Sequence, residues 1–247
     1  MSGRIIEKLK DCDAFLFDKD GTLIDFNYLW LNWSVAAARF ISRHISSLTE
    51  NDVLFQWGVS ASEDTVDSEG PMAVGSLNDI ILSAAGLIYR HNRLWPEARQ
   101  LAVDAVDHSW KTLSKEQYTR AIKGIPEMIQ DLKREGKKLA VVTTDETESA
   151  FQDIKLIGLE GLFDVILGCD RVERCKPFPD LVLEACSRMG VSPENTVVIG
   201  DTRADMLMGK KAGVSFCVGV TSGLGSAEKL RQDAHIVLDS AASLIIS

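Results

Sequence analysis

Residues 14–23 read AFLFDKDGTL, and this stretch decides the fold of the 247-residue chain. Its first four residues are all apolar, which is typical of a strand buried on both faces of a parallel sheet. Two carboxylates, Asp18 and Asp20, come directly after that strand. Functional groups collect at the carboxyl ends of strands in open parallel sheets, so the stretch predicts a strand and the beginning of a site.

Further apolar runs along the chain predict the other strands of the sheet. These runs are residues 139–142, 165–167, 196–199, 214–218 and 236–238. Helix-like segments lie between them at residues 126–135, 178–189 and 203–212, and a glycine follows each one, as is usual where a helix ends. Strands that alternate with helices indicate an α/β fold with a Rossmann-like parallel sheet covered by helices.

The chain between the first two strands follows a different pattern. Its apolar residues recur at helical spacing in three segments, residues 29–45, 77–89 and 94–113. Residues 60–75 are polar, acidic and glycine-containing, which is typical of a loop. We therefore expect an inserted all-helical cap domain at residues 25–118, with residues 1–24 and 119–247 forming the α/β core.

The charge of the chain restricts its partners. There are 36 acidic and 27 basic residues, which give a formal net charge of −9 at pH 7. Charge of this sign repels nucleic acid and anionic membrane surfaces, so we expect neither as a partner. It repels a small anionic substrate as well, so an anion site in this chain requires a local cation or a metal.

The sequence also indicates a compartment. The N-terminal residues show no apolar signal core, and no apolar run approaches the roughly 18 to 20 residues that span a bilayer. The cysteines lack the close pairs typical of metal sites, and they are Cys12, Cys169, Cys175, Cys186 and Cys217. We expect reduced, mostly buried thiols in a cytoplasmic protein.

Polar side chains follow the later strands as well. Thr143 and Thr144 come after the second strand, and their hydroxyls suit phosphate oxygens. Lys176 lies in a segment that two prolines stiffen, so its ammonium is presented from a fixed loop. Asp201 and Asp205 follow the strand at 196–199, one helical turn apart. Each has a structural alternative, because threonines end strands, lysines are solvated and aspartates cap helices.

The aspartates together predict a metal pocket. Carboxylates packed this closely repel one another, which raises their pKa unless a cation neutralises them. Asp18, Asp20, Asp201 and Asp205 supply oxygen ligands, and such ligands favour Mg²⁺. Gly21 permits the tight backbone turn that follows the first pair.

In this order the motifs resemble those of the haloacid dehalogenase-like (HAD) superfamily of phosphohydrolases. Residues 18–22 look like its first motif, Thr143 like its second and Lys176 like its third. Asp201 and Asp205 look like its fourth motif. The amino-acid sequence around the third and fourth motifs is most similar to that of phosphoglycolate-phosphatase-like members, which carry a helical cap after the first motif.

The resemblance implies a magnesium-dependent phosphohydrolase that acts on a small phosphorylated metabolite, with phosphoglycolate as an example. By this resemblance Asp18 attacks phosphorus and forms an aspartyl-phosphate. Asp20 protonates the leaving group and then activates water. Thr143 and Lys176 bind the phosphoryl oxygens, and Thr144 stays a candidate for the same contact because of its hydroxyl at the strand end.

The same resemblance implies how the metal is held. Asp18, the main-chain carbonyl of Asp20, and Asp201 would bind Mg²⁺, and Asp205 would lie nearby. A cation at this place allows an anionic nucleophile to approach an anionic phosphate.

Other functions stay open. A sugar phosphomutase keeps the same motifs, and a non-catalytic binding protein can share the fold. Lys19 is reminiscent of P-type ion pumps, which have threonine where this chain has Asp20. Phosphonate-cleaving members use a lysine early in the cap, and the sequence has no lysine between Ile24 and Trp110. We therefore expect no phosphonate cleavage.

The cap has two features of its own. Arg39, Arg43 and Arg90 are candidates for substrate selection by a closing cap, although a solvated helix face explains them as well. The second feature is an aromatic cluster made of Tyr28, Trp30, Trp33 and Phe40. We expect it to pack the cap helices, with a homodimer contact through the cap as the alternative.

Overall fold

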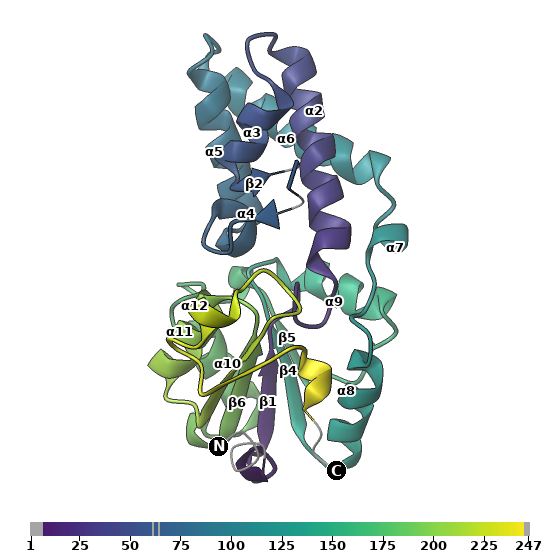
Figure 1. Ribbon diagram of the computed structural model, residues 1–247, viewed down its shortest axis with the longest axis vertical. Helices are drawn as coiled ribbons and strands as arrows, with labels where there is room; N and C mark the ends of the chain where they lie inside the picture. Colours follow the sequence, from purple (N-terminus) through teal and green to yellow (C-terminus); the bar gives the residue numbers. More distant parts are fainter. Residues whose placement is uncertain (1–6, 61, 64, 245–247) are drawn as a thin grey trace. The chain divides into compact units, whose positions relative to one another are not determined.

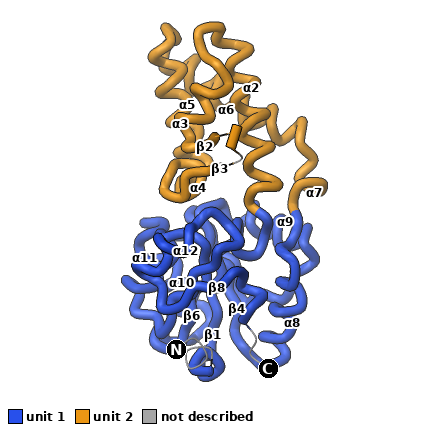
Figure 2. The backbone as a smooth tube through the Cα atoms, in the orientation of Figure 1, with its two compact units in different colours: residues 1–25, 120–247 blue, residues 26–119 orange. Residues whose placement is uncertain are grey.

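The computed structural model describes residues 7–60, 62–63 and 65–244. The chain divides into two compact units, shown in different colours in Figure 2. We call Met1–Asp25 with Arg120–Ser247 the core and Phe26–Thr119 the insertion. The sequence placed these boundaries at residues 25 and 118.

The core is built on a parallel sheet. Its strands within the described residues are β1 (Ala14–Phe17), β4 (Lys138–Val142), β5 (Val165–Leu167), β6 (Thr196–Gly200), β7 (Phe216–Val220) and β8 (Ile236–Leu238). They lie in the order β5-β4-β1-β6-β7-β8, and every neighbouring pair is parallel (Figure 1). The predicted α/β fold with a Rossmann-like parallel sheet is confirmed. The fifth strand begins at Phe216, two residues later than its apolar run indicated.

Helices cover both faces of this sheet. They are α8 (Ile125–Arg134), α9 (Thr147–Leu156), α10 (Asp180–Met189), α11 (Arg203–Ala212) and α12 (Ala227–Leu230). Apolar side chains of α8 and α9 pack on one face, and those of α10, α11 and α12 pack on the other. The helix α11 has the predicted bounds, whereas α9 was not expected because its sequence, TESAFQDIKL, mixes polar and apolar residues.

The position of β1 in the middle of the sheet explains why all its residues are apolar. Phe15 and Phe17 belong to the cluster that α8 and α9 cover, whereas Ala14 and Leu16 belong to the opposite cluster. Phe15 pairs in register with Leu139 of β4 and with Val197 of β6, so β1 is flanked on both edges as well. Every side chain of the strand is therefore removed from water.

The insertion contains a π-helix and six α-helices within its described residues. These are Asn27–Leu31, α2 (Asn32–His44), α3 (Glu50–Gln56), α4 (Pro71–Val74), α5 (Leu77–Tyr89), α6 (Trp95–Thr112) and α7 (Lys115–Tyr118). The prediction of an all-helical insertion is wrong in one part. β2 (Val59–Ser60) pairs antiparallel with β3 (Thr65–Val66), where a loop was expected. Two-residue strands are too short to produce a visible alternation in the sequence.

The aromatic cluster packs the interior of the insertion. Trp33 is fully buried, and its ring centroid lies 5.6 Å from that of Trp30 and 6.1 Å from that of Trp57. Trp110 of α6 completes the contact at 5.6 Å from Trp33. The packing interpretation is therefore confirmed for Trp30 and Trp33, whereas Tyr28 is exposed. Arg39 lies on the surface of the same unit and forms an ion pair with Glu50.

Both connections between core and insertion leave from one seam in the core. Ile24 forms an antiparallel bridge with Ala121, and the Asp25 N–H donates to the Arg120 carbonyl oxygen at 3.0 Å. The Arg120 guanidinium also forms an ion pair with the Asp25 carboxylate at 2.7 Å. The outgoing and returning segments are therefore tied together before the insertion begins.

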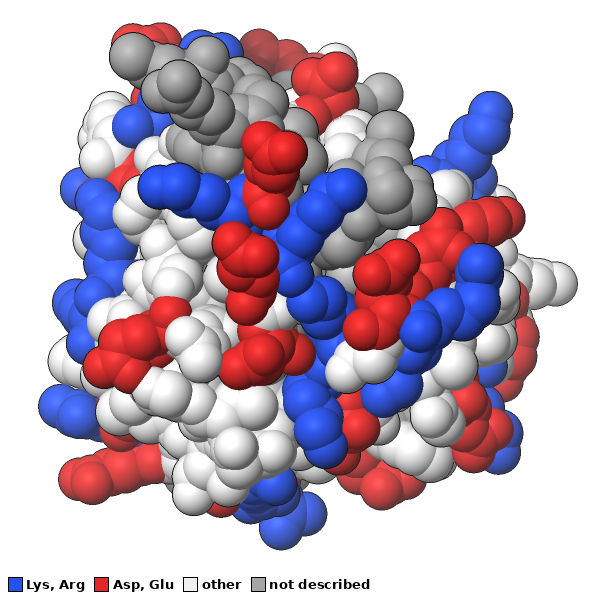
Figure 3. Space-filling view, turned by 90° about the horizontal axis from the view of Figure 1, so that it is seen from below, with Lys and Arg blue, Asp and Glu red and all other residues white. Residues whose placement is uncertain are grey.

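The surface of the chain mixes both signs of charge. Figure 3 shows acidic and basic side chains interspersed on the face seen from below. Surface ion pairs such as Lys133 with Asp164 contribute to this pattern. Among the described residues, no helix is both long enough and apolar enough to cross a membrane.

We expect Phe15→Ala to lower the free energy of unfolding of the core by about 3–5 kcal/mol, because it leaves a cavity between β1 and the helices α8 and α9. The measurement is urea denaturation followed by circular dichroism. Leu183→Ala, at a side chain of α10 that is 45% exposed, is the control. Similar losses in the two variants would contradict the assignment of β1 as the centre of the core.

Candidate active site

The carboxyl ends of three neighbouring strands bring most of the predicted site residues together. Asp18 directly follows β1, and its N–H continues the ladder by donating to the Ile199 carbonyl oxygen (2.8 Å). Thr143 follows β4 and Asp201 follows β6. Because β1 lies between those strands, the three side chains share one edge of the sheet. Carboxylate oxygens of Asp18, Asp201 and Asp205 lie within 4.8 Å of one another, and all three residues are buried.

Lys176 supplies positive charge to this cluster. Its ammonium forms ion pairs with Asp18 and with Asp205, the latter at 2.7 Å, and its side chain is only 4% exposed. Two residues further on, the Phe178 ring contacts both the Arg174 guanidinium (4.9 Å) and the Lys211 ammonium (5.0 Å), which ties this loop to α11. The predicted presentation of a lysine from a fixed loop agrees with this geometry.

Asp205 has the capping role that the sequence left open, and it also belongs to the acidic cluster. One carboxylate oxygen, Oδ2, accepts a hydrogen bond from the Thr202 N–H (3.0 Å), and the Asp205 N–H donates to the Thr202 hydroxyl in return. This capping box begins α11. The other oxygen, Oδ1, faces Lys176. The helix cap therefore fixes the carboxylate that completes the acidic cluster.

Asp201 is held by the loop that follows β7. Its Oδ2 accepts a hydrogen bond from the Leu224 N–H (2.7 Å), while its buried Oδ1 accepts none from any described residue. Two glycines make this close approach feasible. A Cβ atom on Gly21 would lie 2.4 Å from Asp201 Oδ2, and one on Gly223 would lie 2.0 Å from it. Gly21 also has φ of +84°, so the predicted tight turn is confirmed.

Burial and mutual repulsion set the electrostatics of the cluster. Burial raises the pKa of Asp18 to about 6, although Lys176 opposes the shift. Burial, together with the nearby Asp18 and Asp205 carboxylates, raises the pKa of Asp201 well above its ordinary value. Burial would lower the pKa of Lys176, but its two carboxylate partners outweigh this effect and raise it. Lys176 alone therefore does not neutralise the negative charge of the three carboxylates, and a further cation would be needed to do so.

These residues fit a divalent metal ion. The donor set consists of hard carboxylate oxygens, which Mg²⁺ prefers, and Asp201 Oδ1 is buried without a hydrogen bond from the described residues. Asp18, Asp201 and Asp205 are the residues that would hold the ion. The Asp20 carboxylate lies outside this set, because its Oδ2 forms an ion pair with Lys19 at 2.6 Å. A metal contact from Asp20 is therefore left to its main-chain carbonyl, as the family resemblance implied.

The sequence did not indicate the second charged cluster of the site. Lys19 is fully buried, and its ammonium forms ion pairs with Asp20 (2.6 Å), Asp145 (3.1 Å) and Asp153 (2.8 Å). Asp153 belongs to α9 and is itself buried. Burial raises the pKa of Asp20, and the neighbouring Lys19 opposes that shift. The only sequence feature that could have indicated this cluster is a lysine directly after a strand whose residues are all apolar.

The predicted threonines lie at the end of β4. Thr143 is buried, and its hydroxyl oxygen accepts a hydrogen bond from the Asp145 N–H at 3.2 Å. Thr144 is half-buried at the same strand end. Both residues therefore directly follow the strand that neighbours β1, and their roles in binding phosphate stay predictions.

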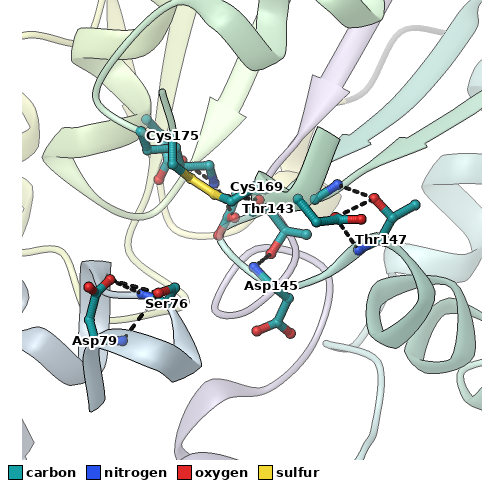
Figure 4. The surroundings of a disulfide bond; sticks show 12 residues. Ser76, Asp79, Thr143, Asp145, Thr147, Cys169 and Cys175 are labelled. Carbon is teal, nitrogen blue, oxygen red and sulfur yellow. Dashed lines mark hydrogen bonds and ion pairs between the residues drawn. A yellow bond between two sulfur atoms is a disulfide. The ribbon is translucent and has the colours of Figure 1, made fainter. Parts of the chain in front are cut away.

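The expectation of reduced thiols is wrong for one pair of cysteines. Cys169 and Cys175 form a disulfide, shown beside Thr143 in Figure 4. A short 3₁₀-helix, Cys169–Arg171, turns the chain back, so the two Cα atoms lie 5.2 Å apart, a separation that a disulfide spans. The bond closes the loop that directly precedes Lys176. Cys12, Cys186 and Cys217 are buried free thiols, as expected.

The chain combines a parallel α/β core, a buried acidic cluster at the carboxyl edge of its sheet and an insertion after its first strand. The family model described as haloacid dehalogenase-like hydrolase matches residues 15–219 of this chain. This match covers most of the chain and includes every predicted site residue. The chain therefore belongs to the haloacid dehalogenase-like hydrolase family.

Individual relatives align with this chain over different shares of its length. The pyrophosphatase PpaX of Halalkalibacterium halodurans is 30% identical over 236 residues, which cover 95% of this chain and 96% of that protein. The phosphoglycolate phosphatase of Aquifex aeolicus is 38% identical over 103 residues, which cover 42% of this chain and 48% of that protein. The prediction of a phosphatase of this family is confirmed at the level of the enzyme class.

Solved structures share the fold. A predicted phosphoglycolate phosphatase from Haemophilus somnus has a TM-score of 0.71 at 20% identity, covering 95% of this chain and 96% of its own. The β-phosphoglucomutase of Clostridium difficile has a TM-score of 0.64 at 21% identity, covering 95% of this chain and 93% of its own. At these identities the likeness extends to the fold alone.

We expect Mg²⁺ to raise the melting temperature less at about pH 5 than at about pH 7.5, with an apparent affinity about 10-fold weaker at the lower pH. The reason is that protons compete with the ion at Asp18, whose pKa lies at about 6. Without metal, this group acts in the opposite direction. Its folded pKa exceeds the ordinary 3.8, so its contribution to stability is complete below about pH 4 and is lost as the pH rises through about 6.

The measurement is thermal unfolding across a Mg²⁺ titration at both pH values. Asp201→Asn should remove most of the Mg²⁺ effect, whereas Asp131→Asn, at an exposed surface position, should keep it. Equal Mg²⁺ effects at both pH values would show that the ion binds elsewhere.

Proposed function

We propose that the chain is a Mg²⁺-dependent phosphohydrolase that cleaves a small phosphate monoester through an aspartyl-phosphate on Asp18. The observation that carries the proposal is the placement of the Asp18 carboxylate. It is buried at the end of the central strand, beside the ammonium of Lys176 and the carboxylates of Asp201 and Asp205. A buried nucleophile between a fixed cation and a metal-ligand set suits phosphoryl transfer, which depends chiefly on positioning and charge.

In the first half of the proposed reaction, an Asp18 oxygen forms a bond to phosphorus as the bond to the leaving oxygen breaks. Asp20 gives its proton to that leaving oxygen. In the second half, Asp20 takes a proton from water, the water oxygen bonds to phosphorus, and the bond from Asp18 breaks to release phosphate. Asp20 Oδ1 suits this transfer because it accepts no hydrogen bond from the described residues.

The remaining residues bind and orient. Lys176 holds the Asp18 carboxylate and, with Thr143 and Thr144, would contact the phosphoryl oxygens. Mg²⁺, when bound, would supply the positive charge that lets an anionic nucleophile and an anionic phosphate approach each other.

For the substrate we propose a small, phosphoglycolate-like monoester. The phosphoglycolate phosphatase named above supports this choice. Inorganic pyrophosphate is the second candidate, because the relative that aligns over nearly its full length is a pyrophosphatase. A sugar phosphomutase and a non-catalytic binding protein share the fold, and the tests below separate them from a hydrolase.

We expect Asp18→Asn to lower kcat by at least about 10³-fold, because the amide cannot act as the nucleophile. The measurement is Mg²⁺-dependent phosphate release from para-nitrophenyl phosphate. Asp11→Asn, a substitution at an exposed residue of the same unit, should keep full activity. Near-normal turnover by Asp18→Asn would overturn the nucleophile assignment.

We also expect the wild-type enzyme to release phosphate from phosphoglycolate with a higher kcat/KM than from pyrophosphate or glucose 1-phosphate, assayed as a panel with Mg²⁺. A preference for pyrophosphate would favour the second candidate. Conversion of β-glucose 1-phosphate into glucose 6-phosphate without phosphate release would indicate a mutase instead. Binding without any turnover would indicate the non-catalytic alternative.

A further inference from the structure

We propose that Lys19 is a positioning residue that fixes the Asp20 carboxylate for proton transfer in both halves of the reaction. This inference rests on the proposed function, in which Asp20 is the acid and then the base. Lys19 itself touches neither phosphate nor the leaving group in this scheme. It acts by holding one oxygen of Asp20 in a defined place.

The first argument is the way in which Asp20 is held. Lys19 Nζ lies 2.6 Å from Asp20 Oδ2, so that oxygen is committed to an ion pair. The other oxygen, Oδ1, accepts no hydrogen bond from the described part of the chain. Anchoring one oxygen stops rotation of the carboxylate and leaves its second oxygen available. Proton transfer requires this kind of fixed geometry, since a donor must reach its acceptor within hydrogen-bond distance.

The second argument is that the lysine is anchored from several directions. Asp145 comes from the segment that follows β4, and Asp153 comes from α9. The ammonium therefore joins the end of β1, the end of β4 and a helix that covers the sheet. Because Thr143 lies two residues before Asp145, the same network relates Asp20 to the strand end that would bind phosphate. A lysine held by Asp20 alone would move with it and could not position it.

The third argument is energetic. A fully buried ammonium loses its hydration, and replacing a buried ion cluster with apolar residues is often neutral or stabilising for the fold. One carboxylate would suffice to neutralise the lysine, yet the described residues place three around it. Stability alone therefore does not explain the cluster, whereas positioning of Asp20 does.

The test variant is Lys19→Met, which keeps the length of the side chain and removes its charge. With para-nitrophenyl phosphate, the leaving group departs without a proton, so formation of the aspartyl-phosphate does not require an acid. Breakdown of that intermediate still requires a base. We expect a rapid burst of para-nitrophenol equal to the enzyme concentration, followed by a steady-state rate about 10 to 100-fold below wild type. KM should fall by a similar factor, so that kcat/KM, which reports formation of the intermediate, changes by less than about 3-fold.

Because Lys19→Met leaves buried carboxylates unpaired, it also weakens the fold, so a second variant separates the two effects. Lys19→Met combined with Asp153→Leu removes the buried carboxylate on α9, and we expect it to recover most of the lost melting temperature. The slow steady-state rate and the burst should persist in this double variant. A purely structural lysine predicts the opposite, namely that the rate recovers together with the stability.

A double-mutant cycle with Asp20→Asn provides the last check. If Lys19 acts through Asp20, adding Lys19→Met to Asp20→Asn should slow turnover by less than about 2-fold further. Independent, multiplicative effects would overturn the proposal, and so would a wild-type rate in the stable double variant with Asp153→Leu. Failure of the wild-type enzyme to hydrolyse any phosphate ester would instead refute the proposed function, which keeps the two failures distinct.

Discussion

The structure depends on a single electrostatic constraint, which is that carboxylates buried at one edge of the sheet must be balanced by cations. Asp18, Asp201 and Asp205 face one another with little access to water. Lys176 balances part of their charge, while burial and the nearby Asp205 carboxylate still raise the pKa of Asp18. Helix caps, glycine contacts and the stiff loop around Lys176 all serve to hold this unfavourable arrangement in place.

The pleat of the central strand separates the site into two charged clusters. Consecutive residues of a strand point to opposite faces, and this alternation continues past the end of β1. Asp18 faces the side of α10 and α11, where it meets Lys176 and Asp205. Lys19 faces the side of α9, where it meets Asp153. The nucleophile Asp18 and the proposed positioning residue Lys19 therefore lie next to each other in sequence but are supported by different halves of the core.

Sequence patterns predicted the parts that depend on neighbouring residues. The bounds of α5 and α11, the apolar central strand and the strand-end aspartates all follow from local spacing. The partners of Lys19 were not predictable, since Asp145 and Asp153 are far away in sequence and nothing local marks them as its partners. The Cys169–Cys175 disulfide was missed for a related reason, because its formation depends on how a short turn folds back.

The seam at Ile24 and Ala121 has a consequence for the order of folding. Within the part of the chain that the structure describes, β1 pairs only with β4 and β6, which lie far along the sequence, so a long loop must close before β1 gains a neighbour. Contacts of such high sequence separation slow folding. An insertion that first condenses around its own tryptophans brings its two ends together at this seam. Once its ends are joined at this seam, a folded insertion shortens the effective loop that must close before β1 pairs with β4.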